Sequence, residues 1–229
     1  MPVRARLATA AGYWLPSSAL VSNRVRRFVG ARATIDRDDA VALTFDDGPH
    51  REGTRAILEL LENAKARATF FLVGEQVERS PEVAKDVAAA GHEIGVHCQR
   101  HRNLMRLTPR QVRDDLDRAA DVIAATTARE PRVYRPPYGI LTMAALRYAC
   151  DAGWEIFLWR KAGKDWDAGA TPDSIAGRIL RRLEPGDVIL LHDADHYSAV
   201  SSWRRTAGAL ELLLRELGQR GLGTATLTS

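Results

Sequence analysis

From residue 39 onward the sequence alternates between short apolar runs and longer amphipathic segments, and no other feature constrains the fold as strongly. The runs are bounded by turn residues and have the length of buried strands. Strands are expected at residues 41–45, 68–73, 93–96, 132–134, 156–159, 188–191 and 224–227. A strand–helix unit repeated about seven times implies parallel strands joined by right-handed crossovers. The pattern therefore predicts a single α/β domain over residues 39–229.

The segments between the apolar runs carry helical periodicity and helix-start signals. Apolar residues share one helical face at Val112, Leu116, Ala119 and Ile123, and at Leu210, Leu213, Leu214 and Leu217. A capping hydroxyl precedes a proline at Ser80-Pro81, Thr108-Pro109 and Thr171-Pro172. Gln111 completes a capping box with Thr108. These signals place helices between the expected strands.

Charge and cysteine content argue against a nucleic-acid-binding protein and against a disulfide-stabilised one. The chain has 229 residues, a formal net charge of +4 and 33 Lys and Arg side chains. The arginines are scattered among alanines and acids instead of forming runs, so we interpret them as solvated helix faces and expect no nucleic-acid partner. Two cysteines, Cys98 and Cys150, give no disulfide framework.

Residues 1–38 are expected to form a leader that packs on the domain. The apolar stretch over residues 7–21 is interrupted by Gly12 and Pro16. It is too broken for a secretory signal, which needs roughly 7–15 unbroken apolar residues, and too short for a membrane helix of about 20. We expect no stable membrane span. A cytoplasmic location is favoured, with secretion or cell-surface attachment as the alternatives.

Polar side chains cluster directly after five of the expected strands. The clusters are Asp46 and Asp47, His97 and His101, Arg135 to Tyr138, Asp165 and Trp166, and His192 and Asp193. In parallel α/β folds the active site lies at the carboxyl ends of the strands, in the loops that follow them. The five clusters are therefore predicted to converge on one site.

Asp46 and Asp47 suggest a bound cation at this site. Adjacent carboxylates at the end of a buried run repel each other and lose solvation, which a cation offsets; a solvated Asp-Gly-Pro turn is the alternative. His97 and His101 can converge on one ion, and a carboxylate completes a three-ligand set with room for water, as in catalytic zinc sites. Zinc is the favoured metal, although cobalt or nickel suits the same ligands.

Together these motifs resemble the polysaccharide deacetylases of the NodB-homology, carbohydrate esterase 4 type. The chain carries Thr-Phe-Asp-Asp-Gly-Pro at 44–49, His-x-x-x-His at 97–101, Arg-Pro-Pro-Tyr-Gly at 135–139, Asp-Trp at 165–166 and Leu-Leu-His-Asp at 190–193. The resemblance covers roughly residues 39–228. It implies a distorted (β/α)7 barrel of parallel strands and metal-dependent removal of acetyl groups from sugars.

The resemblance also implies a role for individual residues. Asp47, His97 and His101 match the metal ligands, Asp46 the general base, Arg135 the residue that orients this base, and His192 the general acid. Tyr138 matches the position whose backbone N–H holds the oxyanion, and Trp166 and Leu190 match the wall around the acetyl methyl group. Pro137 and Asp165, from the same motifs, are assigned to substrate binding with them.

Two positions depart from the family pattern. Cys98 stands where a Ser or Thr is common, and we expect it not to ligate the metal. Ala162 stands where many members have an aspartate that pairs with the catalytic histidine. We hypothesise that Asp193 or Asp195 supports His192 instead.

The loop over residues 193–203 is longer and more polar than a connection requires. With His196, Tyr197 and Trp203 it is either a lid or sugar platform, or a surface loop in which Trp203 anchors the last helix. The other tryptophans outside the motifs, Trp14, Trp154 and Trp159, are predicted to be core residues.

The sequence thus predicts a hydrolase of linear amides that removes an N-acetyl group from a poly- or oligosaccharide or a sugar conjugate, with carbohydrate as its partner. Two alternatives remain. One is a hydrolase with the same site acting on a non-carbohydrate amide or imide, and the other is a catalytically silent sugar-binding protein.

Overall fold

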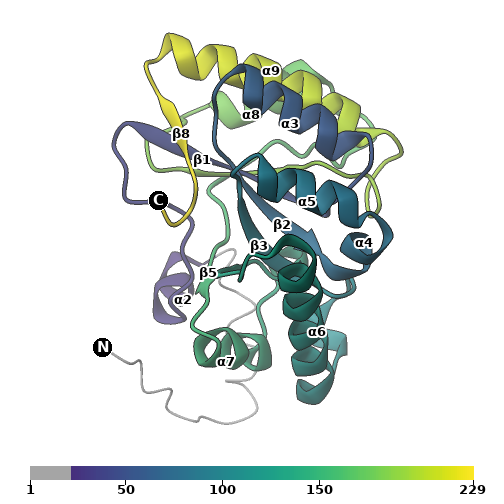
Figure 1. The fold of residues 1–229 in the computed structure, drawn as a ribbon. Helices are drawn as coiled ribbons and strands as arrows, with labels where there is room; N and C mark the ends of the chain where they lie inside the picture. The colour runs from purple at the N-terminus through teal and green to yellow at the C-terminus, as the bar shows by residue number, and fades with distance from the viewer. Residues whose placement is uncertain (1–21) are drawn as a thin grey trace.

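A single curled sheet of parallel strands forms the centre of the computed structural model, which describes residues 22–229 (Figure 1). The strands are β1 (Ala40–Asp46), β2 (Thr69–Val73), β3 (Glu93–Cys98), β4 (Val133–Tyr134), β5 (Glu155–Ile156), β6 (Lys161–Ala162), β7 (Val188–His192) and β8 (Gly223–Ala225). They lie in the order β5-β4-β3-β2-β1-β7-β6, with β8 paired to the first part of β1. The predicted parallel α/β barrel is confirmed.

Helices cover the outer side of the sheet (Figure 1). They are α2 (Asn23–Phe28), α3 (Gly53–Asn63), α4 (Gly74–Arg79), α5 (Pro81–Ala89), α6 (Pro109–Thr127), α7 (Met143–Asp151), α8 (Pro172–Leu180) and α9 (Ser202–Gln219), with short 3-10 turns η2 (Leu104–Arg106) and η3 (Pro137–Gly139). Thr108 and Thr171 form the capping boxes of α6 and α8. Ser80 precedes α5 as predicted, but its hydroxyl does not cap the helix.

Both faces of the sheet are buried, which explains the unbroken apolar runs. All seven residues of β1 are buried. Val41, Leu43 and Phe45 pack with the helices, whereas Ala40 and Ala42 belong to a smaller apolar cluster on the other face. In β1 the larger side chains therefore lie under the helices and the two alanines inside the curl, next to Phe71 and Phe157.

One expected strand is mostly irregular backbone in the structure. The run at 156–159 forms only the end of β5, and the chain then crosses to the opposite edge of the sheet, where β6 pairs with β7. The crossing carries Phe157 and Leu158, whose carbonyl groups become important at the site. Apolar character alone could not separate a strand from this buried crossing.

Residues 32–35 bridge the end of β5 and the amino end of β7. On one side Arg32 N–H donates to the Ile156 carbonyl (2.8 Å) and Leu158 N–H donates to the Arg32 carbonyl (2.7 Å). On the other side Ile35 N–H donates to the Gly186 carbonyl (2.8 Å). The proposed domain start at residue 39 remains a prediction, but these bonds tie the preceding residues into the sheet.

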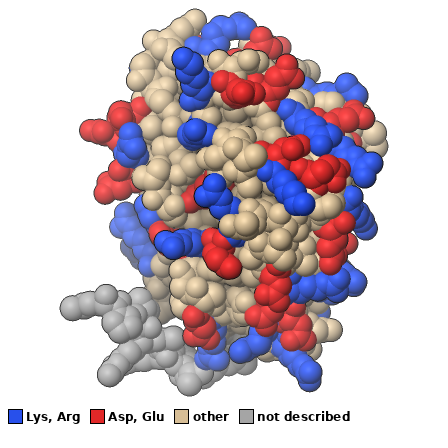
Figure 2. Space-filling view, viewed as in Figure 1, with Lys and Arg blue, Asp and Glu red and all other residues tan. Residues whose placement is uncertain are grey.

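The rest of the predicted leader is described only in part. Residues 1–21, including Trp14, lie outside the described residues. Within the part that the structure describes, no helix has both the length and the apolar character needed to cross a bilayer. On the face drawn in Figure 2, basic and acidic side chains are interspersed and form no continuous patch of one sign.

We expect Ile35→Ala to lower the free energy of unfolding by about 2–5 kcal/mol, because Ile35 is buried in the inner cluster and truncation leaves a cavity. Chemical denaturation would measure the loss. Asp36→Ala, at the exposed neighbouring position, is the matched control and should change stability by less than about 0.5 kcal/mol. Equal stability of both variants would contradict a structural role for this segment.

Candidate active site

The predicted functional residues meet at the carboxyl ends of neighbouring strands. Asp46 is the last residue of β1 and His192 the last residue of β7, and the two lie opposite each other in the strand register. His97 lies near the end of β3, and Arg135 directly follows β4. Sequence separations of more than 90 residues are thus bridged by the order of the parallel strands alone.

Arg135 and Asp46 form a buried ion pair beneath the site. The Arg135 side chain is 0 % exposed, and its Nη1 donates to Asp46 Oδ1 at 2.7 Å and to Thr44 Oγ1 at 2.8 Å. Nε and Nη2 donate to the carbonyl groups of Phe157 (3.1 Å) and Leu158 (3.2 Å). Every nitrogen of the guanidinium therefore has a partner, and Asp46 is held in one orientation.

Asp47, His97 and His101 form a group with the composition of a metal site. One ligand atom from each lies within 4.8 Å of the others. Asp47 Oδ1 is 3.6 Å from His97 Nε2 and 3.4 Å from His101 Nε2. Asp47 has a φ of 79°, a left-handed conformation that is rare outside glycine and is often found at functional sites.

The electrostatics of this group favour a cation. Burial, reinforced by the nearby Asp46 charge, raises the pKa of Asp47 to about 7. Burial lowers the pKa of His97 to about 3 and that of His101 to about 3, so both imidazoles are neutral and each has a free lone pair. The His97 Nδ1–H donates to the Arg135 carbonyl at 2.8 Å, which leaves Nε2 directed at Asp47.

The buried oxygen Asp47 Oδ1 has no hydrogen-bond partner. An unpartnered, buried carboxylate oxygen next to two neutral imidazoles is satisfied by a divalent cation. The donor set therefore fits a metal such as zinc. The neighbouring Cys98 is not part of this group; burial raises the pKa of its thiol well above the ordinary value.

His192 is supported by Asp165, which corrects the hypothesis that Asp193 or Asp195 takes this role. His192 Nδ1 donates to Asp165 Oδ1 at 3.0 Å, and the His192 backbone N–H donates to Oδ2 at 2.6 Å. Burial alone would lower the pKa of His192, but the Asp165 carboxylate outweighs it and raises the pKa to about 10. The imidazolium form, with a proton to give on Nε2, is therefore favoured.

Asp193 and Asp195 have other partners. Asp193 is buried under Gly48 and accepts a hydrogen bond from Thr54, while Asp195 accepts one from the Ser201 backbone N–H at 2.7 Å. Sequence proximity to His192 was misleading because both acids lie in the loop after β7, where the path of the loop backbone directs each side chain to other partners. Asp165 instead reaches His192 from the loop after β6.

These residues surround a pocket of about 440 Å³. Tyr138, Trp166 and Leu190, all predicted substrate-binding residues, line it together with Trp159, Tyr197 and Ser198. Pro137 and Asp165 do not line the pocket; both are buried behind its wall. Trp159, predicted to be a core residue, both packs on the core and faces the pocket.

Comparison with known proteins agrees with this geometry. The family model for polysaccharide deacetylases matches residues 34–157, more than half of the chain. A peptidoglycan-N-acetylglucosamine deacetylase of Bacillus cereus is 34 % identical over 189 residues, covering 82 % of this chain and 67 % of the relative. The chain belongs to the polysaccharide deacetylase family.

Other members of the family extend the comparison. A chitooligosaccharide deacetylase of a Bradyrhizobium species is 34 % identical, covering 80 % of this chain and 86 % of the relative. The solved structure of a peptidoglycan N-acetylglucosamine deacetylase superposes with a TM-score of 0.81 at 31 % identity, covering 89 % of this chain and 92 % of the other. The protein is thus a hydrolase of the carbohydrate esterase 4 class.

A family member without activity is also structurally similar. The wild-type carbohydrate esterase 4 pseudoenzyme of Bacillus anthracis has a TM-score of 0.75 and 29 % identity, covering 83 % of this chain and 64 % of its own. The fold alone therefore does not decide activity, and the arrangement of individual side chains has to be considered.

Tyr197 is the main contribution to this deacetylase site that the motifs did not reveal. Its ring stacks on that of His101 with centroids 4.4 Å apart and planes 16° apart. Its hydroxyl donates to Glu75 Oε1 at 2.8 Å and accepts from Gln76 Nε2 at 2.9 Å, both on α4. Tyr197 therefore fixes the plane of one predicted metal ligand.

The loop over residues 193–203 was predicted to be either a lid or sugar platform, or a surface loop anchored by Trp203, and it has features of both. Tyr197 and Ser198 form part of the pocket wall, whereas Trp203 is buried at the start of α9 and lies near His50. Because Tyr197 stacks on His101, that face of its ring is not available to a sugar. Tyr138 (53 % exposed) and Trp166 (37 % exposed) are the most exposed aromatic residues that line the described pocket.

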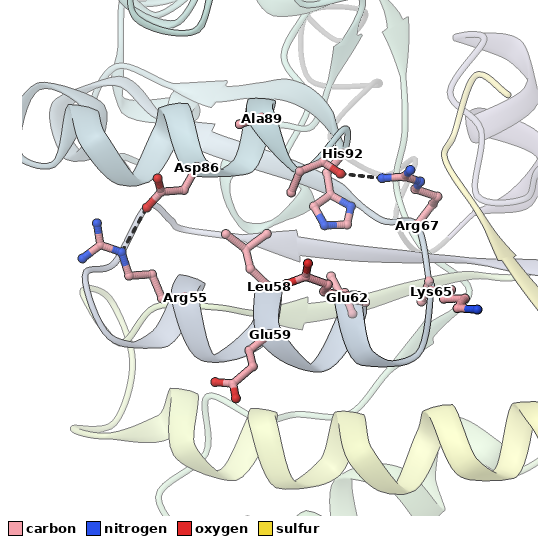
Figure 3. A pocket seen from close by; sticks show the side chains of 12 residues that line it. Arg55, Leu58, Glu59, Glu62, Lys65, Arg67, Asp86, Ala89 and His92 are labelled. Carbon is pink, nitrogen blue, oxygen red and sulfur yellow. Dashed lines mark hydrogen bonds and ion pairs between the residues drawn. The ribbon is translucent and has the colours of Figure 1, made fainter.

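A larger hollow of about 690 Å³ lies at the opposite end of the strands, between α3 and α5 (Figure 3). It is lined by the turns that precede β2 and β3, so it lies at the amino ends of the strands. Arg55 pairs with Asp86 at 3.0 Å across it, and His92 points into it (Figure 3). None of the predicted catalytic residues lines this hollow.

We expect Asp165→Asn to lower the pKa of His192 in the metal-free protein and to reduce turnover by on the order of a hundredfold. NMR titration of the His192 ring would measure the first effect. In the native protein the raised pKa stabilises the fold fully below about pH 6.5, and this stabilisation is lost as the pH rises towards 10. Asp167→Asn, an exposed neighbour, is the control, and an unchanged His192 titration in Asp165→Asn would contradict the pairing.

We expect Tyr197→Ala to weaken zinc binding by about tenfold, since residues that orient a metal ligand usually contribute this much. Competition with a chromophoric chelator would measure the affinity. Tyr197→Phe keeps the stacked ring and loses only the bonds to Glu75 and Gln76, so its affinity should lie between those of the wild type and the alanine variant. Wild-type affinity in Tyr197→Ala would show that the stack does not position His101.

Proposed function

We propose that this protein removes the acetyl group from an N-acetylated sugar of a glycan, releasing acetate and leaving a free amine. One observation carries the proposal. An oriented carboxylate, Asp46, and a protonated imidazole, His192, end neighbouring paired strands beside the Asp47–His97–His101 group. Amide hydrolysis needs a base for the water, an acid for the amine and a stabilising group for the carbonyl oxygen.

Asp47, His97 and His101 would hold the metal, with zinc the first choice and cobalt or nickel the alternatives. When bound there, a divalent metal would polarise the acetyl carbonyl and lower the pKa of a water molecule. The proton transfers of the reaction are carried out by the side chains of Asp46 and His192.

Asp46 accepts the proton of the attacking water, and the oxygen of this water forms a bond to the carbonyl carbon. Arg135 keeps the Asp46 carboxylate facing the pocket through the 2.7 Å contact. His192 then donates its Nε2 proton to the amide nitrogen as the carbon–nitrogen bond breaks. Asp165 stabilises the charged imidazole before the transfer.

The walls of the pocket support a sugar substrate. Trp166 meets the His192 ring edge-on, with centroids 5.3 Å apart, and Leu190 adds an apolar surface at the base of the pocket. A small apolar wall suits an acetyl methyl group. Tyr138 and Trp166 expose aromatic surface at the rim, which suits the apolar faces of sugar rings.

Acetate release from N-acetylglucosamine oligomers by the zinc-loaded protein tests the proposal. We expect Asp46→Asn to retain zinc and lose on the order of 10²–10⁴ in kcat, because it removes the base but not a ligand. Asp47→Asn should lose zinc affinity first. Asp38→Asn, exposed and outside the pocket, is the control for a lost carboxylate.

The outcomes separate the alternative functions. Binding of the oligomers without acetate release would favour a silent sugar-binding protein, as the similarity to a pseudoenzyme suggests. Hydrolysis of small amides or cyclic imides without release from sugars would favour a non-carbohydrate substrate. Either result would overturn the proposal.

A further inference from the structure

A second hollow of about 680 Å³ adjoins the catalytic pocket. It shares His101 and Tyr138 with the pocket and continues along the loop after β3, where it is lined by Arg102, Arg106, Leu107 and Ile140. A glycan with one sugar in the catalytic pocket would place a neighbouring sugar in this hollow, on the far side of Tyr138.

Tyr138 divides the two hollows. Its φ of 58° is left-handed, and its ring meets His101 edge-on with centroids 4.5 Å apart. With about half of its surface exposed, the ring forms a ridge that two adjacent sugars can straddle. Leu107 and Ile140 supply apolar surface beyond the ridge.

The charge of this hollow is positive. Arg102 is committed to Asp115, to which its Nη2 donates at 2.6 Å, and the other Asp115 oxygen accepts from the Gln99 backbone N–H at 2.8 Å. Arg106 is exposed and has no acidic partner among the described residues. No carboxylate lines the hollow. The charge of Arg106 is thus uncompensated, next to an Arg102 whose buried Nε also lacks a partner.

We propose that this hollow is a subsite for a neighbouring sugar that carries a carboxylate, so that the protein prefers acidic N-acetylated glycans over neutral ones. The inference rests on the proposed deacetylase function. A guanidinium binds a carboxylate through charge-assisted hydrogen bonds, and Arg106 is the side chain free to do so. The preference for acidic glycans would come from the loop after β3, whereas the residues of the hydrolysis reaction lie at the ends of the strands.

A matched pair of oligomers tests the preference. Both alternate N-acetylglucosamine with N-acetylmuramic acid; in one the lactyl carboxyl is free and in the other it is a carboxamide. We expect the wild-type zinc-loaded protein to show a kcat/KM roughly twofold to fivefold higher for the free acid, mostly through KM, because an exposed ion pair contributes modestly and equally to ground and transition states. The ratio should fall at high salt.

Arg106→Gln should bring the ratio of the two kcat/KM values close to one while leaving turnover of the carboxamide oligomer unchanged. Arg106→Lys keeps the charge and should retain much of the preference. Arg178→Gln removes the same charge from the exposed face of α8 and should leave the ratio at the wild-type value. Melting temperatures would confirm that each variant is folded.

The possible failures are distinct. Equal kcat/KM for both oligomers in the wild type, or a preference that survives in Arg106→Gln, would overturn the subsite and leave the deacetylase function standing. Absence of acetate from both oligomers, while N-acetylglucosamine oligomers still release it, would also overturn the subsite alone. Absence of acetate from all of these oligomers would overturn the subsite together with the proposed function.

Discussion

The site depends on a guanidinium that has no contact with water. Burying the charge of Arg135 is costly, and burial lowers the pKa of this group. The cost is offset by Asp46, by Thr44 and by two carbonyl groups of the 157–158 crossing, while the faces of Phe71 and Trp159 lie 4.2 and 5.7 Å from its centre. These contacts join β1, β2, β4 and the crossing. The same Arg135 contacts therefore orient the base, Asp46, and hold the crossing against the sheet at this end.

The sequence was most informative where function and secondary structure coincide. Apolar runs located the strands, and polar residues at their ends were brought together by parallel pairing, as with Asp46 and His192. The grouping of Asp47, His97 and His101 follows from the same rule. These predictions needed only local patterns and the general geometry of α/β folds.

Contacts made by loops and crossings could not be predicted in the same way. Asp165 was assigned to substrate binding although its oxygens bind His192 and Thr206, and Asp193 was given its role because it is adjacent in sequence. Tyr197 reaches His101 from a loop without a motif. Residues 32–35 look like part of a leader but hydrogen-bond to the end of β5 and to the amino end of β7. In each case the partner depends on the path of irregular backbone, which hydrophobic periodicity does not record.

The strand register places Asp46 opposite His192, so the distance between their backbone positions is set by the spacing of paired strands. Adjacent strands lie about 4.8 Å apart whatever their side chains, so the sheet sets the spacing of the two backbone positions, and Arg135 and Asp165 then fix where the two side chains point. Insertions and substitutions in the surrounding loops can then change which substrate binds without altering the relative positions of Asp46 and His192. The substrate range of such a protein can therefore change through its loops while its reaction stays the same.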